Sequence, residues 1–353
     1  MSNIMGLGVV GAPLNSGPYS PAKEKAVMRG PHNRLLAQRL RQLLGHIGSV
    51  RIKIFLPICA ILAIIVIAGR AASIMGWDHH SLQPKSSPPR KRYTVLINTW
   101  KRNDLLKKSV KHYAGCSSVD AVNVVWSETE PPSESLKEYL RKTVDAKSQS
   151  SNKPDLRFNL NKVDNLNNRF RPIEDLRTDA VFSVDDDVIF PCSTLEFAFS
   201  VWQSAPDTMV GFVPRMHWID SKKTDMSRYT YGGWWSVWWM GTYSMVLSKA
   251  AFLHKKYLDM YTNQMPAAIR EYVISERNCE DIAMSFLVAN ATGAPPIWVK
   301  GKIFEIGSTG ISSLKGHSER RTRCLNDFVA LFGHMPLVAS NVKAVSARDK
   351  WFW

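Results

Sequence analysis

The chain has 353 residues and a formal net charge of +16 at pH 7. Nine of its 46 basic residues and one of its 30 acidic residues lie at or before Arg70, which leaves 37 basic and 29 acidic residues, a surplus of +8, in the other 283. The sequence contains no nucleic-acid-binding motif, so the positive charge does not indicate a nucleic-acid partner, although the surplus is compatible with an anionic ligand.

The N-terminal quarter contains a candidate membrane anchor. Ile54 to Gly69 (IFLPICAILAIIVIAG) is uncharged and apolar, and Ala71 to Trp77 extends it to the ~20 residues that a bilayer requires. A buried core helix is the alternative, but basic residues dominate the preceding segment, as the positive-inside rule expects of a cytoplasmic tail. About 50 residues precede the span, so a retained anchor is favoured over a cleaved signal peptide. The sequence predicts a single-pass type II membrane protein with a cytoplasmic tail over 1–51 and a transmembrane helix over 52–76.

The next segment is predicted to be an extended stem. Residues 81–92 (SLQPKSSPPRKR) are proline-rich and basic and have no apolar periodicity. We therefore assign a stem to 77–92 and one folded lumenal domain to 93–345. The lumen permits disulfides, and the four cysteines of this part allow three complete pairings. Asn290 begins an Asn-Ala-Thr glycosylation sequon in the same compartment.

The lumenal domain alternates predicted strands and helices. Tyr93 to Trp100 is a β-rich apolar run, and Asn103 to Tyr113 places its apolar residues on one face of a helix. Further strands are predicted at 122–126, 157–163, 180–184, 209–213 and 297–303. This alternation predicts an α/β fold whose mainly parallel sheet is covered on both faces, with its ligand at the carboxyl ends of the strands.

Three consecutive carboxylates, Asp185, Asp186 and Asp187, directly follow one of these strands. Clustered carboxylates repel one another unless a cation compensates, and oxygen ligands suit Mg²⁺ or Mn²⁺ bridging a diphosphate. A solvated acidic turn is the alternative. The strand context favours a divalent metal.

A second acidic pair, Glu280 and Asp281, begins an apolar helical pattern. The two carboxylates could simply complement the helix dipole, or Asp281 could stabilise a positive sugar carbon. His317 and Arg321 are four residues apart and would share a helix face, where they could donate to a departing diphosphate or remain ordinary solvated charges.

Gly233 to Trp239 (GWWSVWW) concentrates four of the twelve tryptophans. These rings could form a sugar-binding wall, pack in the core or rest against a membrane surface. The sequence alone leaves these three interpretations open.

Several segments, in order, resemble the exostosin-like glycosyltransferase domain, family 64. The resemblance runs from about Tyr93 to Met335 and rests on YTVLINTWKRNDLL, VVW, NNRFRP, VDDDVIF, YSMVLSKAAFLHKKY, NCEDIAM and RTRCLNDF. It implies a GT-A fold, of the Rossmann-like nucleotide-diphospho-sugar transferase type, and a Mn²⁺-dependent transfer from a nucleotide sugar with retention of configuration.

The resemblance also implies residue roles on the nucleotide side of the site. Arg102 matches a nucleotide-base contact, and Arg169 matches a position near the donor sugar or diphosphate. Asp185 matches the ribose-side acid and Asp187 the metal ligand, with Asp186 between them as a further substrate-binding residue.

On the sugar side, Asn278 and Asp281 match donor-sugar positions, with Asp281 nearest the anomeric carbon, and Glu280 is counted as substrate-binding. His317 and Arg321 match leaving-group contacts, so Asp281 and Arg321 are the predicted catalytic residues. Cys279 and Cys324 match a family disulfide.

The short form with an N-terminal anchor resembles family members that act on sphingolipids in the Golgi membrane. This implies mannose transfer from GDP-mannose to a glucuronic-acid-containing glycosylinositol phosphorylceramide, a glycolipid acceptor. Animal relatives that use UDP-N-acetylhexosamines have Asn after the VVW strand, where this chain has Ser127 and Glu128. Transfer from such a UDP-sugar to an acidic glycan or glycolipid is one alternative, and a non-catalytic glycan-binding scaffold is another.

Overall fold

The computed structural model describes residues 39, 42, 54–68, 92–148, 153–222, 228–307 and 316–347. The chain divides into two compact units, Met1–Ser86 and Ser87–Trp353. In the first unit, residues 54–68 are helical. Across the ranges described, none of the helices has both the length and the hydropathy to cross a membrane. The other residues of the predicted span 52–76 lie outside these ranges.

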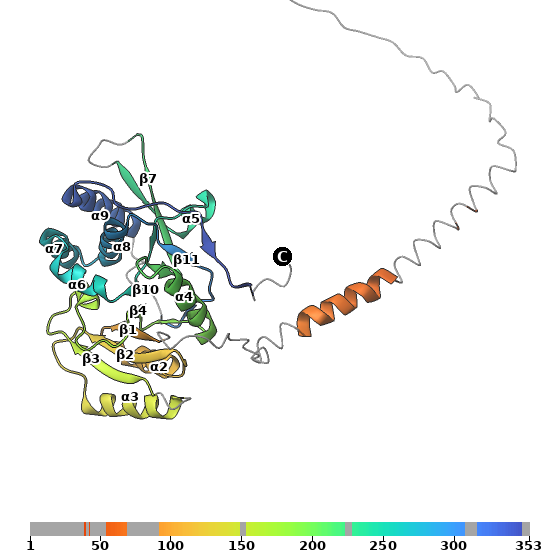
Figure 1. Cartoon of the computed structure of the whole chain (residues 1–353), viewed down its shortest axis with the longest axis horizontal. Helices are drawn as coiled ribbons and strands as arrows, with labels where there is room; N and C mark the ends of the chain where they lie inside the picture. The colour runs from red at the N-terminus through yellow and green to blue at the C-terminus, as the bar shows by residue number, and fades with distance from the viewer. Residues whose placement is uncertain are drawn as a thin grey trace, which may run out of the picture. The chain divides into compact units, whose positions relative to one another are not determined.

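The second unit is built on an eight-stranded sheet with the strand order β13-β11-β6-β10-β4-β1-β2-β3 (Figure 1). The strands are β1 (Tyr93–Thr99), β2 (Val119–Trp126), β3 (Asp155–Leu160), β4 (Ala180–Asp185), β6 (Val210–Gly211), β10 (Ala250–His254), β11 (Ile297–Val299) and β13 (Lys343–Ala344).

The sheet is mixed, although most of its pairings are parallel, as the sequence predicts. Strand β10 is the exception, because it runs antiparallel to both β4 and β6. This strand was not predicted from the sequence. Its five residues, AAFLH, are too short to show a period, and their alanines favour helix.

Helices cover both faces of the sheet, because the side chains of each strand alternate between two cores. On β1, Val95 and Ile97 pack into one core with residues of α2, α3 and α4, whereas Leu96 packs into the other with residues of α6 to α9. The helices are α2 (Asn103–Tyr113), α3 (Glu134–Lys147), α4 (Cys192–Ser204), α6 (Lys256–Asn263), α7 (Ala267–Glu276), α8 (Glu280–Thr292) and α9 (His317–Phe332).

Helix α8 explains how the second core is filled. It is apolar almost all round, and nine consecutive residues from Asp281 to Ala289 are buried. A helix of this kind must lie inside the fold. Its first turn, with Glu280 and Asp281, is therefore held rigidly between α6, α7 and α9, which Figure 1 shows grouped around it.

Two small sheets and a short helix complete the unit. Strand β7 (Pro214–Ile219) pairs with both β8 (Tyr229–Gly232) and β9 (Met245–Val246), and β5 (Val188–Ile189) pairs with β12 (Phe304–Glu305). Helix α5 (Trp234–Met240) follows β8 directly. The β5–β12 pair lies beyond the carboxyl end of β4, and a short 3-10 helix, η1 (Leu166–Phe170), packs against α6 and α7.

Candidate active site

The three aspartates lie at the carboxyl end of β4, beside the end of β1. Asn98 of β1 is in register with Asp185, and the backbone N–H of Asp186 donates to the carbonyl of Asn98 at 3.2 Å. The Asp186 side chain is fully buried, and it accepts a 2.6 Å hydrogen bond from the Thr99 hydroxyl. Burial raises the pKa of Asp186 to about 6, although Thr99 and Arg102 oppose this shift.

Arg102 binds two of these carboxylates. Its guanidinium is 2.6 Å from Asp186 and 3.0 Å from Asp187. The preceding Lys101 has a left-handed φ of +52°, and its N–H donates to the Glu128 carboxylate at 2.8 Å. An L residue adopts this conformation only at some energetic cost, so Glu128 fixes the turn from which Arg102 reaches the aspartates.

The structure thus places Arg102 on the acidic cluster. The contact between Arg102 and a nucleotide base stays a prediction. Ser127, the first residue after the VVW strand, accepts a 3.0 Å hydrogen bond from the buried Asn168 amide. The two residues after the VVW strand therefore hold the loops of the site.

Asp187 is more accessible than Asp186, with 23% of its side chain exposed. The loop after β12 passes directly over it. The Ile306 N–H donates to the Asp187 carbonyl at 2.7 Å, and a Cβ on Gly307 would lie only 2.6 Å from the Asp187 Cβ. Only glycine allows this close approach.

The aspartate cluster fits a divalent cation held together with a diphosphate. Carboxylate oxygens suit Mg²⁺ or Mn²⁺, and such ions are commonly bound by one or two carboxylates plus substrate phosphates. Among the residues described, only His112, Cys116 and Cys192 form a group of three possible metal ligands whose ligand atoms lie within 4.8 Å of one another. The three aspartates are not such a group, so they do not enclose an ion by themselves. The two cysteines of that other group form a disulfide, so they are not available as thiolate ligands.

Arg169, from η1, joins the aspartates to the first turn of α8. Its side chain is 4% exposed, lies 2.7 Å from Asp185 and 3.8 Å from Glu280, and donates to the Ser248 hydroxyl at 3.3 Å. Burial alone would lower the pKa of Arg169, but the two carboxylates raise it above the usual value. The buried guanidinium is therefore fully charged.

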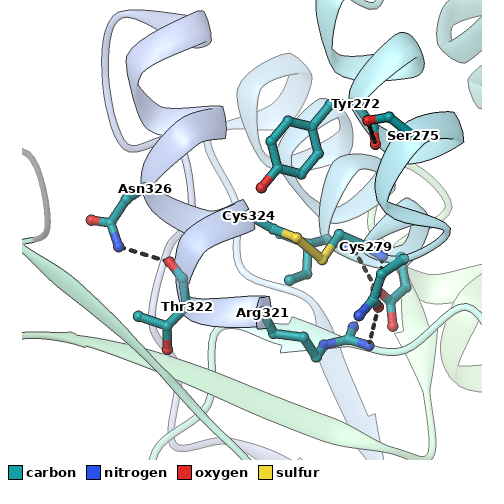
Figure 2. Close-up of a disulfide and its surroundings, with 10 residues drawn as sticks. Tyr272, Ser275, Cys279, Arg321, Thr322, Cys324 and Asn326 are labelled. Carbon is teal, nitrogen blue, oxygen red and sulfur yellow. Dashed lines mark hydrogen bonds and ion pairs between the residues drawn. A yellow bond between two sulfur atoms is a disulfide. The ribbon is translucent and has the colours of Figure 1, made fainter. Parts of the chain in front are cut away.

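The turn before α8 has an unusual backbone. Arg277 and Cys279 both have left-handed φ values, +48° and +73°, although neither is glycine. The Cys279 N–H donates to the Asn278 side-chain oxygen at 2.9 Å, and Cys279 forms a disulfide with Cys324 of α9. Figure 2 shows this disulfide between α9 and the turn, with Arg321 below it. The pairing matches the one that the family resemblance implies.

The disulfide brings Arg321 against Asp281. The two form an ion pair in which each side chain is 7% exposed, and Arg321 also donates to Asn278 at 3.5 Å. Burial alone would raise the pKa of Asp281, but the charge and hydrogen bond of Arg321 and the 2.7 Å hydrogen bond from the Ile282 N–H lower it. Asp281 is therefore ionised.

Glu280, next to it, behaves in the opposite way. Burial and the negative charge of Asp281 raise the pKa of Glu280 to about 7, against the effects of Arg169 and Arg321. The first turn of α8 thus presents two adjacent carboxyls whose pKa values are shifted in opposite directions, that of Asp281 downward and that of Glu280 upward. Such divergent pKa values are typical of functional sites.

His317 and Arg321 are both in the first two turns of α9, as their spacing predicts. Burial lowers the pKa of His317, and the positive charge of Arg321 adds to this effect. Three buried nitrogens around the ion pair have no hydrogen-bond partner among the described residues: Asn278 Nδ2, Arg321 Nε and His317 Nδ1. Buried polar atoms are normally paired, so these point to a polar ligand.

Four further residues, Thr99, Arg215, Tyr231 and Ser248, contribute to the site and were not predicted from the sequence. Thr99 and Ser248 donate or accept hydrogen bonds at Asp186 and Arg169. The Tyr231 ring lies 4.9 Å below the Arg321 guanidinium in a cation–π contact. Arg215, on β7, lies close enough for its charge to act on both Tyr231 and His317. Thr99 and Ser248 lie within segments that resemble the family, but nothing in the sequence marks either residue as part of the site, because the four converge only through the tertiary fold.

The remaining predicted features lie outside this cluster. Asn290 is exposed in the last turn of α8. The tryptophans of α5 do not pack in the core, since they are between 44% and 81% exposed. The core-packing interpretation is therefore wrong for these four residues.

The sequence comparisons identify relatives of the chain. Residues 93–351 match the model of the glycosyl transferase family 64 domain. The glycosylinositol phosphorylceramide mannosyl transferase 1 of Arabidopsis thaliana is 60% identical over 318 residues, which cover 90% of this chain and 94% of that protein. Mouse exostosin-like 2 is 32% identical, covering 90% of this chain and 95% of that protein. Mouse exostosin-2 is 35% identical over 72% of this chain but only 34% of its own length.

Among solved structures, the mannosyltransferase from Pyrobaculum calidifontis in complex with GDP-Man and Mn²⁺ matches with a TM-score of 0.37 and 13% identity, covering 68% of this chain and 65% of that chain. The family match covers well over half of the chain, and the Arabidopsis relative is matched over nearly its whole length. The chain therefore belongs to glycosyltransferase family 64, the exostosin-like family, and is a glycosyltransferase.

Proposed function

We propose that the chain transfers mannose from GDP-mannose to a glucuronic-acid-containing glycosylinositol phosphorylceramide, with retention of configuration, in the Golgi lumen. The 60% identity to a protein named for a mannosyl transfer to this lipid class supports the substrate. The domain is then of GT-A type, with a catalytic region over 93–345 behind an anchor over 52–76 and a stem over 77–92.

The observation that carries the proposal is the set of unpartnered buried nitrogens beside the Asp281–Arg321 ion pair. Three single nitrogens, one each on the guanidinium, the imidazole and the amide, have no hydrogen-bond partner among the described residues. Such donors suit the anionic oxygens of a diphosphate and the hydroxyls of a sugar. In this proposal Arg321 and His317 bind the departing diphosphate, and Asn278 binds the donor sugar.

Asp281 supplies the opposite charge. Its carboxylate is ionised and rigidly held, so it stabilises positive charge as it develops on the sugar carbon. The acceptor hydroxyl then attacks on the face from which the diphosphate leaves, and configuration is retained. Asp187 would hold Mn²⁺, which neutralises the diphosphate when bound, and Asp185 and Asp186 would bind the substrate beside it.

Arg169 positions the two halves of the site. It contacts Asp185 on the proposed ribose side and Glu280 beside the proposed sugar carbon. Because Arg169 is buried and fully charged, it fixes the separation between the nucleotide and the reacting carbon.

The test is turnover of the full chain with GDP-mannose and UDP-N-acetylglucosamine offered in parallel, with Mn²⁺ and the glycolipid acceptor present. Selective mannose transfer with retained configuration supports the proposal. Selective use of the UDP-sugar would show that the donor is not GDP-mannose. An absence of turnover with both donors would contradict the proposed activity.

A matched variant tests the metal site. Asp187→Asn should raise the Mn²⁺ concentration needed for half-maximal activity by about tenfold or more, because it removes a metal-binding charge. Asp164→Asn, which removes a surface partner of Arg277, serves as the control and should leave this concentration unchanged. An unchanged Mn²⁺ requirement in Asp187→Asn would exclude Asp187 as the ligand.

A further inference from the structure

Helix α5 exposes a continuous aromatic surface that the proposed chemistry does not use. Trp235 and Trp239 are 77% and 81% exposed, Trp238 is 62% exposed and Trp234 is 44% exposed. At 100° per residue the four rings fall within an arc of about 140° on the helix. Val237, on the other side of the helix, is 1% exposed and anchors it to the protein.

The size of this surface indicates a binding role. With aromatic side chains of about 150–250 Å² each, the exposed part of the four rings amounts to roughly 500 Å². Soluble proteins rarely leave a contiguous apolar patch of this size uncovered, and those that do commonly use it to bind a partner.

We propose that α5 is a membrane-docking helix that inserts its four tryptophans into the headgroup region of an anionic bilayer. The proposal rests on the proposed function in one respect only: a lipid acceptor requires the site to work at a membrane surface. Tryptophan is enriched at membrane–water interfaces, where its amphipathic ring is most stable.

The charges beside the helix favour an anionic lipid surface. Trp234 contacts Trp298 of β11 at 5.6 Å between ring centroids, and the Lys343 ammonium lies 3.6 Å from the centre of the Trp298 ring. Lys300 and Lys343 are both exposed, and the charge of Lys300 acts on Lys343, so two lysines lie close together here. Lysines next to interfacial tryptophans attract negatively charged headgroups.

The ring geometry favours a membrane over a sugar-binding wall. Sugars stack on flat ring faces that line a groove, whereas here the rings project from the convex surface of a helix. Trp235 and Trp238 meet edge to face, at 86°, and Trp238 and Trp239 are tilted by 47°. The rings therefore do not share one stacking plane.

The position of α5 in the chain connects docking to catalysis. Trp234 follows Tyr231 by three residues, a distance of at most about 11 Å along the backbone, and the Tyr231 ring contacts Arg321. Docking of α5 thus brings the Asp281–Arg321 centre close to the headgroups that carry the acceptor sugar.

The test compares acceptors in two states, using the full chain reconstituted in lipid nanodiscs. The variant is Trp235→Ser with Trp239→Ser, and the matched control is Tyr139→Ser with Ile274→Ser. These control residues are 47% and 49% exposed and lie on α3 and α7. We expect the tryptophan variant to transfer sugar about tenfold more slowly to the bilayer-embedded glycolipid, because it loses interfacial anchoring.

The same variant should keep wild-type turnover on the water-soluble headgroup released from that lipid, and the control should keep both activities. Equal loss on the soluble headgroup would overturn the proposal in favour of a sugar-binding wall, and unchanged transfer to the embedded lipid would overturn it outright.

A second measurement does not depend on enzyme activity. Lipids brominated near the headgroup should quench the tryptophan fluorescence of the wild type more strongly than that of the variant. Equal quenching would overturn the docking proposal, whichever donor and acceptor the enzyme uses. With the same brominated lipids, nanodiscs of phosphatidylcholine alone should quench the wild type less than nanodiscs that also contain phosphatidylserine. The double variant Lys300→Gln with Lys343→Gln should abolish this difference. If the wild type shows no difference between the two nanodiscs, a preference for anionic lipid is excluded.

Discussion

The substitution Asp281→Asn tests the centre of the proposed mechanism. It removes the negative charge but keeps the side-chain oxygen that accepts the Ile282 N–H. The ion-paired Arg321, itself only 7% exposed, then loses its main counter-charge in a buried environment. The variant should therefore affect both stability and turnover, by amounts that can be separated.

Breaking a buried ion pair by removing one partner costs about 3–5 kcal/mol. The asparagine oxygen still accepts a hydrogen bond from Arg321, so we expect the lower end, about 3 kcal/mol, or a fall of about 10 °C in Tm for a unit of this size. Removing a preorganised charge that stabilises the transition state costs a further 100-fold to 1000-fold, approximately, in kcat.

The assay measures kcat and donor KM at a temperature at which both proteins are folded, and GDP binding by calorimetry. We expect a large fall in kcat with GDP affinity within about threefold of the wild type, because Asp281 is proposed to face the sugar carbon while other residues, including Arg102, Asp185 and Arg321, bind the nucleotide. A variant with near-normal kcat would refute the role of Asp281. Loss of GDP binding in proportion to kcat would instead indicate a structural role.

Replacing Cys279 and Cys324 with serine should cost about 4 kcal/mol in the free energy of unfolding, from the 45-residue separation, and should also lower kcat. The matched variant of Cys116 and Cys192, with a separation of 76, should lose similar stability yet keep kcat, and equal kcat losses would contradict a catalytic link. The free energy of unfolding of Glu280→Gln should increase relative to that of the wild type as pH rises from 4.5 to about 7. The raised pKa of Glu280 stabilises the folded wild type only while this carboxyl is protonated, that is, at low pH, whereas the glutamine does not titrate. Urea unfolding at about pH 5 and pH 7.5 measures this, and a constant difference would contradict it.

The sequence determined the elements with the strongest local patterns. The run YTVLINT and the amphipathic segment after it are β1 and α2, with the helix bounds as predicted, because a continuous apolar strand and a one-faced helix are encoded within a few residues. The family was also evident from the sequence, since the ordered motifs that carry it run through the whole catalytic region.

The sequence could not supply the direction of β10 or the partners of the charged residues. Strand direction depends on which strands lie on either side, and β10 lies between β4 and β6, far from it along the chain. In the same way, Arg169 meets Glu280 and Arg321 meets Asp281 across separations of 111 and 40 residues.

Local sequence therefore determined which side chains are acidic, basic or aromatic and where the most strongly patterned elements, such as β1 and α2, begin. Tertiary packing decided which carboxyl is ionised, because the pKa values of Glu280 and Asp281 differ only through burial and the position of Arg321. It also decided that the tryptophans of α5 face outward, since Val237 is the residue by which that short helix is buried against the protein. Charge and apolarity belong to the residue, but desolvation and contact belong to the fold.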